Sequence, residues 1–172
     1  GWLQSVDESH PFLKDVPWVG YGAAAKGMTV LNSLSWRLPL HYIVDDSKCK
    51  QGFHATNRRY PIVSPSTLRE NPPLSIKGDG AIAVFVLAWN FIEEIKQRMK
   101  VLRENRPTYF VVAYPQKAIY FVSEEGKEYK LFEEVDTRYV QETSTYHKNI
   151  LISHFYNEED LLTQWIRHHA PL

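Results

Sequence analysis

The sequence predicts an α/β protein built on a doubly wound, mostly parallel sheet. Short apolar runs alternate with helix-patterned segments between residues 16 and 113, and parallel strands need connections of that length. The most apolar run, residues 81–87 (AIAVFVL), is typical of a central strand that is covered on both faces. A glycine-rich turn joins the first predicted strand to the first long helix. Together these observations favour a sheet of about five parallel strands between helices.

The composition limits the class of protein. The chain has 172 residues, enough for one domain of ordinary size, and is 44% hydrophobic and 23% charged, as globular proteins are. Its 20 basic residues balance its 20 acidic ones, which argues against a nucleic-acid partner. A single cysteine excludes an internal disulfide framework. Because no apolar run is long enough to span a bilayer, we expect a cytoplasmic protein without a membrane span.

The expected strands are short apolar runs bounded by glycine, proline or acidic residues. They cover residues 16–21, 40–44, 61–63, 81–87 and 108–113. The expected helices have helix-forming residues with apolar positions three or four apart. They cover residues 23–34, 64–69 and 91–105, the last with a basic outer face. A long polar loop is expected from residue 47 to 59, and a short helical or irregular segment at 7–14.

The domain organisation follows from a change of texture after Pro115. Residues 117–122 and 128–132 flank a Glu-Gly-Lys turn and predict a hairpin. Beyond it we expect a strand at 150–155 and a C-terminal helix at 157–169. The predicted division is therefore a lead-in (1–15), the α/β domain (16–132), a linker (133–149) and a strand–helix segment (150–172).

The glycine turn is the first candidate binding element. Its motif is G-x-G-x-x-A, and the candidate residues are Gly20, Gly22, Ala23, Ala24 and Lys26. Small residues at the start of a helix let backbone amides approach an anion such as a diphosphate, and Lys26 adds positive charge. The alternative is that the turn needs small residues only to pack the helix on the sheet.

The second predicted strand supplies further candidates. It ends in Asp45 and Asp46, where Rossmann-like folds keep an acidic residue for a ribose hydroxyl. In the following segment Lys50 belongs to a group of basic residues between Ser47 and Arg69, a stretch that contains no acidic residue. This basic run comprises Lys48, Lys50, Arg58, Arg59 and Arg69. We expect Lys50 and the loop 47–59 to close over an anionic ligand; the alternative is a solvated surface loop.

Trp89 and Asn90 follow the most apolar strand. An aromatic ring and an amide there can stack on and hydrogen-bond a base or a sugar, although a tryptophan is as often simply packed. The histidines lack metal-ligand spacing and Cys49 has no identifiable base, so we expect neither a metal site nor a catalytic residue.

Four segments of the chain carry a family resemblance. They are 19–27 (VGYGAAAKG), 43–52 (IVDDSKCKQG), 61–65 (PIVSP) and 87–95 (LAWNFIEEI). In order and spacing they resemble the C-terminal domain of sugar C-methyltransferases, which act on nucleotide-activated deoxysugars. The resemblance implies a Rossmann-like domain that packs against a methyltransferase domain binding S-adenosylmethionine and helps to hold the nucleotide sugar.

The family's zinc-binding cysteines, S-adenosylmethionine loop and catalytic segment have no counterpart in this sequence. We therefore expect a substrate-binding fragment of a larger carbohydrate-biosynthesis protein, inactive alone, with S-adenosylmethionine bound by the parent's other domain rather than by this chain.

Residues 150–169 (ILISHFYNEEDLLTQWIRHH) resemble the first strand and helix of family-2-type glycosyltransferases. That implies a flanking glycosyltransferase domain; the alternative is an ordinary strand and helix docking on the core. Two other functions stay open for the whole chain. The glycine motif and the acidic pair also fit an NAD-type dinucleotide-binding domain, and a purely structural turn fits a non-catalytic interaction domain.

Overall fold

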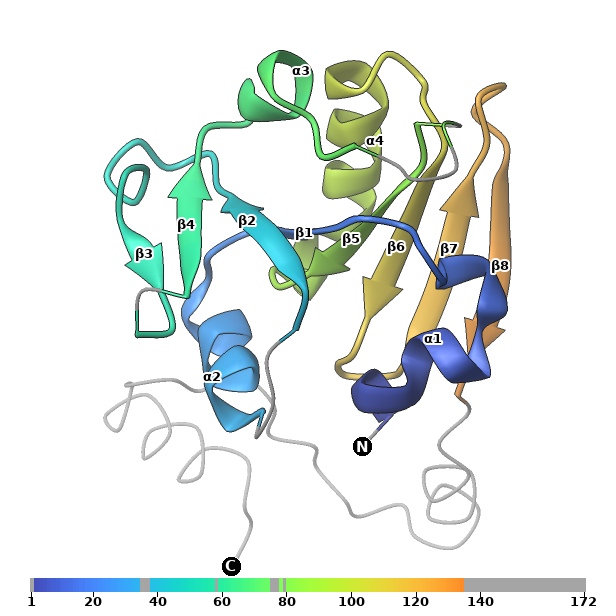
Figure 1. Cartoon of the computed structure of the whole chain (residues 1–172), viewed down its shortest axis with the longest axis horizontal. Helices are drawn as coiled ribbons and strands as arrows, with labels where there is room; N and C mark the ends of the chain where they lie inside the picture. The colour runs from blue at the N-terminus through green and yellow to red at the C-terminus, as the bar shows by residue number, and fades with distance from the viewer. Residues whose placement is uncertain (1, 35–37, 58, 75–77, 79, 135–172) are drawn as a thin grey trace, which may run out of the picture. The chain divides into compact units, whose positions relative to one another are not determined.

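The described part of the chain forms one mixed, mostly parallel sheet. The computed structural model describes residues 2–34, 38–57, 59–74, 78 and 80–134, all of which lie within the compact unit Gly1–Val135. The sheet has eight strands in the order β3-β4-β2-β1-β5-β6-β7-β8 (Figure 1). The predicted α/β, Rossmann-like fold is confirmed.

Five of the strands are parallel. They are β1 (Trp18–Tyr21), β2 (Leu40–Val44), β4 (Tyr60–Val63), β5 (Ile82–Val86) and β6 (Thr108–Val112). β1 pairs with both β2 and β5, so the chain winds to one side of β1 and then to the other. The carboxyl ends of β1 and β5 therefore flank the topological switch point, where open α/β sheets bind their ligands.

Three antiparallel strands extend the sheet at its edges. β7 (Ala118–Val122) and β8 (Glu128–Glu133) form the predicted hairpin, and β7 pairs with β6. β3 (His54–Ala55) pairs with β4, so the segment 47–59, predicted to be a long polar loop, contains a short strand that the prediction missed. A two-residue strand carries no periodic signal in sequence, because only its pairing with β4 defines it.

The connections differ from strict alternation. A long helix follows β1 (α2, Ala25–Ser33) and another follows β5 (α4, Ile92–Leu102), whereas no helix joins β2 to β4. The short helices are η1 (Trp2–Ser5), α1 (Val6–Ser9), η2 (Pro11–Leu13), α3 (Thr67–Glu70) and η3 (Trp89–Phe91). α4 ends before the predicted residue 105, because Glu104 and Asn105 have left-handed φ angles of 53° and 61°.

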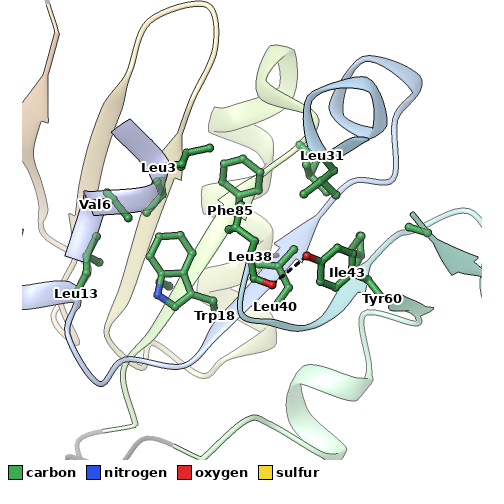
Figure 2. Packing of buried hydrophobic residues seen from close by; sticks show 14 of the residues in the cluster. Leu3, Val6, Leu13, Trp18, Leu31, Leu38, Leu40, Ile43, Tyr60 and Phe85 are labelled. Atoms are coloured by element: carbon green, nitrogen blue, oxygen red, sulfur yellow. Dashed lines mark hydrogen bonds between the residues drawn. The ribbon is translucent and has the colours of Figure 1, made fainter. Parts of the chain in front are cut away.

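One face of the sheet is covered by α2 and the N-terminal helices. Leu31 of α2 and Leu3, Val6 and Leu13 of the N-terminal segment belong to one buried cluster (Figure 2). The buried Tyr60 hydroxyl donates a hydrogen bond to the carbonyl of Leu38, 2.9 Å away, so its polar end is satisfied within this core. The part of the lead-in from Leu3 to Leu13 thus packs into the same core as the strands.

The other face is covered by α3 and α4. Leu68 of α3 and Ile95 and Met99 of α4 pack against the sheet. The expectation of a basic outer face for this helix was wrong at Lys96, whose side chain is only 4% exposed and bonds Glu93 and Glu128 at 2.9 and 2.7 Å. The ammonium group also lies over the Tyr120 ring, so α4 is tied to the β7–β8 hairpin.

The remaining predictions concern the C-terminal part of the chain and the presence of a membrane span. The strand at 150–155, the helix at 157–169 and all but the first residues of the linker 133–149 lie outside the described residues. Within the ranges that the structure covers, none of the helices has the length and apolar character that a membrane span requires.

Candidate functional site

A cleft of about 400 Å³ opens at the carboxyl ends of β1 and β2, beside the first turns of α4. Its lining combines small, apolar, acidic and basic side chains. The lining residues are Tyr21, Gly22, Ala24, Asp45, Asp46, Lys50, Ala88, Phe91, Glu94, Ile95 and Arg98. The cleft lies at the switch point of the sheet and has the size of a small-molecule site.

The glycines of the turn allow a close approach of backbone segments. Gly22 has a φ angle of 85°, and a Cβ atom there would lie 2.5 Å from the Cβ atom of Ala88. Within α2, a Cβ atom at Gly27 would lie 2.5 Å from the carbonyl oxygen of Leu87. The small residues therefore let the start of α2 pack on the segment after β5, and a packing reason for the motif exists without any ligand.

The backbone amides of the turn donate within the chain. Gly22 N–H donates to the carbonyl of Val44 and Ala24 N–H to that of Gly22, both at 2.7 Å. Between them, Ala23 N–H donates to the carboxylate Oδ2 of Asp45 at 2.6 Å. A diphosphate at the amides of residues 22–24 would have to displace these bonds.

Asp45 is a buried node between the turn and the following loop. Its residue exposure is 6%, and besides Ala23 its carboxylate accepts from Ser47 N–H at 2.8 Å and from Lys50 Nζ at 3.2 Å. Its carbonyl accepts from the side-chain amide of Gln51 at 2.9 Å. The loop that was expected to close over a ligand is thus anchored at its start.

The basic run does not stand apart from acidic residues as its sequence suggested. Lys50 pairs with Asp45, and Arg69 pairs with Glu104 at 3.6 Å. Arg58 lies outside the described residues. Tertiary contacts brought these carboxylates to the cations, which local sequence cannot show.

Asp46 lies at the open side of the cleft. Its carboxylate accepts a hydrogen bond from the Tyr21 hydroxyl at 3.1 Å and forms an ion pair with Arg98 at 2.6 Å. The side chains of Asp46 and Arg98 are each about half exposed. Burial and the neighbouring Asp46 charge raise the pKa of Tyr21 far above its usual value. The phenol therefore remains a hydrogen-bond donor, which holds one oxygen of Asp46 in place.

The α4 side of the cleft was missed in the sequence. Phe91, Glu94, Ile95 and Arg98 follow the i, i+3, i+4, i+7 spacing that places residues on one helix face. That signal was present, but the apolar members were taken for core positions. Phe91 is 59% exposed, and within the described residues no hydrogen bond or ion pair engages the Glu94 side chain.

The structure brings some of the predicted site residues together and separates the others. Gly22, Ala24, Asp45, Asp46 and Lys50 line the cleft. The remaining candidates do not line it. Gly20 lies within β1, Ala23 is buried, Lys26 is exposed on α2, Trp89 contacts Tyr114 in a tilted arrangement with ring centroids 5.0 Å apart, and Asn90 is exposed in η3.

A search for metal-binding clusters among the described residues finds no group of three His, Cys, Asp or Glu side chains. The residues that line the cleft offer carboxylate oxygens that can accept from hydroxyl groups, and the exposed ring of Phe91. They also include two cations, Lys50 and Arg98, each of which is paired with a carboxylate.

The chain thus has a Rossmann-like fold with a cleft at the switch point of its sheet. Comparison with protein families then places it: the chain belongs to the family of C-methyltransferase C-terminal domains, whose model matches residues 13–115. A search of curated proteins gives no match. The likeness of residues 150–169 to glycosyltransferases is not supported, since the family match ends at residue 115.

Proposed function

We propose that this domain holds the nucleotide sugar for an S-adenosylmethionine-dependent sugar C-methyltransferase of carbohydrate biosynthesis. The observation that supports the proposal is the cleft at the switch point of the sheet, in a chain that belongs to a C-methyltransferase family. Its mixture of apolar wall and convergent polar groups is typical of small-molecule sites.

Each wall has a role in this proposal. Asp46 and Glu94 offer carboxylate oxygens as acceptors for hydroxyl groups of a ribose or a sugar. Phe91 and Ile95 offer apolar surface to the face of a ring. Gly22 and Ala24 leave room for the ligand to approach the backbone of the turn.

The methyl donor belongs, in this proposal, to another domain of the parent protein. S-adenosylmethionine supplies an electrophilic methyl group to a carbon nucleophile of the substrate. Asp45, the acidic residue whose place after β2 suits a cofactor ribose, is buried, and its carboxylate already accepts from three donors within the chain. Asp45 is therefore not available to a cofactor ribose, and in this proposal the role of the chain is to hold substrate against the flanking domain.

Isothermal titration of the chain with dTDP-, UDP- and GDP-sugars tests the proposal. Phe91→Ala removes the exposed aromatic wall and should weaken binding about tenfold, since part of a phenylalanine face is worth about 1.4 kcal/mol. Val101→Ala is the matched control, because Val101 is an exposed apolar residue like Phe91 but lies near the other end of α4 and does not line the cleft.

Absence of binding by every nucleotide sugar, or equal losses in the two variants, would contradict the proposal. Binding of NAD in place of nucleotide sugars would instead support the dinucleotide-binding alternative. Binding of neither ligand, with binding to a separately produced methyltransferase domain, would support the interaction-domain alternative.

A further inference from the structure

The start of α2 carries a carboxylate of the chain itself near the place where similar folds hold a ligand phosphate. In dinucleotide-type sites the phosphate accepts from amides of the glycine turn at the beginning of the helix. Here Oδ2 of Asp45 lies 2.6 Å from the amide nitrogen of Ala23, two residues before α2 begins. The carboxylate is buried and belongs to the residue directly after β2.

The same carboxylate also takes up the nearest positive charge. Lys50 Nζ lies 3.2 Å from Oδ2, so the ammonium group is neutralised before a ligand arrives. Ser47 N–H fixes the other oxygen at 2.8 Å, which keeps the carboxylate from rotating away. Three independent donors therefore hold one anion in this position.

The rest of the cleft has no spare positive charge for a phosphate. Arg98 is paired with Asp46 at 2.6 Å, and Glu94 adds a carboxylate without a partner among the described residues. Two cations thus face three carboxylates, Asp45 included. A dianionic group in the cleft would meet repulsion that hydroxyl groups and an uncharged ring would not.

We infer that Asp45 supplies, from within the chain, the anion that the glycine turn would otherwise take from a ligand phosphate, and that the cleft selects its ligand through hydroxyl and apolar contacts. For the identity of the ligand this rests on the proposed function. The cleft then holds the glycosyl or nucleoside part of a nucleotide sugar, and the diphosphate lies outside it. Asp45 is a positioning residue that sets this selectivity.

Amide chemical shifts of the ¹⁵N-labelled chain test the inference with inorganic pyrophosphate as the probe. In the wild type, about 1 mM pyrophosphate should leave the amides of residues 22–27 unshifted. Asp45→Asn keeps the shape of the side chain but removes its charge, so pyrophosphate should then bind at these amides at least about tenfold more tightly. Asp46→Asn is the matched control: it removes one charge from the same cleft without touching the Ala23 amide, and should raise the affinity at these amides less than Asp45→Asn does.

Pyrophosphate binding to these amides in the wild type would overturn the inference, as would an equal gain in both variants or no gain in a folded Asp45→Asn protein. If that variant does not fold, the pyrophosphate titration of the wild-type chain tests the inference by itself. A nucleoside and its diphosphate should bind within about threefold of each other, whereas a diphosphate bound more than about tenfold more tightly would refute the inference. Failure of all nucleotide sugars to bind would contradict the proposed function only, since the pyrophosphate titrations test the role of Asp45 independently.

Discussion

Gly27 lies inside α2, where its replacement by alanine should reverse the usual sign of such a change. In an open helix position, alanine stabilises by about 0.5–1 kcal/mol relative to glycine, because glycine loses more backbone entropy on folding. At Gly27, however, an added Cβ atom would lie 2.5 Å from the carbonyl oxygen and 2.6 Å from the Cβ atom of Leu87. The first of these obstacles is backbone, so no side-chain rotation can relieve it.

The net effect follows from the two opposing terms. Forcing α2 away from the segment after β5 is overpacking, which costs up to about 3 kcal/mol. Subtracting the propensity gain leaves a loss of about 2 kcal/mol in the free energy of unfolding. For a chain of this length that lowers the Tm by about 4–8 °C.

Urea unfolding followed by circular dichroism measures the change, with Asn32→Ala as the control. Asn32 is exposed on the same helix, so its replacement should stabilise the protein by about 0.5 kcal/mol through helix propensity alone. Stabilisation by Gly27→Ala of the same size as the control would refute the argument, because it would mean that α2 does not need this close approach.

Two further predictions concern ionisable groups in the packed parts of the fold. Lys96→Met keeps the buried stem but removes the ammonium group, which lies over the Tyr120 ring and bonds two carboxylates. The loss of these contacts should lower the free energy of unfolding by about 1–2 kcal/mol, and no more, because both carboxylates stay in contact with solvent. Urea unfolding checks this against Lys130→Met, which removes one partner of the exposed Lys130–Glu133 pair and should leave the free energy of unfolding nearly unchanged; equal effects would contradict the reasoning. Burial lowers the pKa of His10 below its usual 6.5, so the unfolded chain takes up the proton before the folded chain does as the pH falls. The free energy of unfolding that depends on neutral His10 is therefore full above pH 6.5 and declines as the pH falls below 6.5. His10→Phe preserves a ring beside Phe132 and should flatten the decline measured in melts between about pH 7 and pH 5; an unchanged slope would exclude His10 as its source.

The parallel strands could be predicted from the sequence because each is a local apolar run with clear boundaries. β2 occupies Leu40–Val44 as predicted, since Pro39 precedes it and Asp45 ends the run. β5 was recognised from a run without polar residues, which only a strand covered on both faces can bury. The glycine turn after β1 was likewise evident from its spacing. These features depend on neighbours along the chain.

The chemistry of the cleft depended on tertiary contacts. Asp45 and Asp46 are adjacent in sequence and equivalent in type, yet Asp45 is buried against Ala23 and Lys50 whereas Asp46 faces Arg98 at the open side. Both residues lie beyond the end of β2, and their partners come from 22, 5 and 52 residues away. Nothing in a local pattern distinguishes the two roles.

The sequence by itself determined the fold class, the five parallel strands and the glycine turn beside the cleft, because hydrophobic periodicity and glycine spacing are local properties. Only the tertiary structure decided that β3 pairs with β4, that Lys96 is buried and that the turn donates to Asp45. Each of these depends on which distant residue the folded chain brings into contact, and the free energy of such a contact comes from burial and pairing between elements rather than from either element alone.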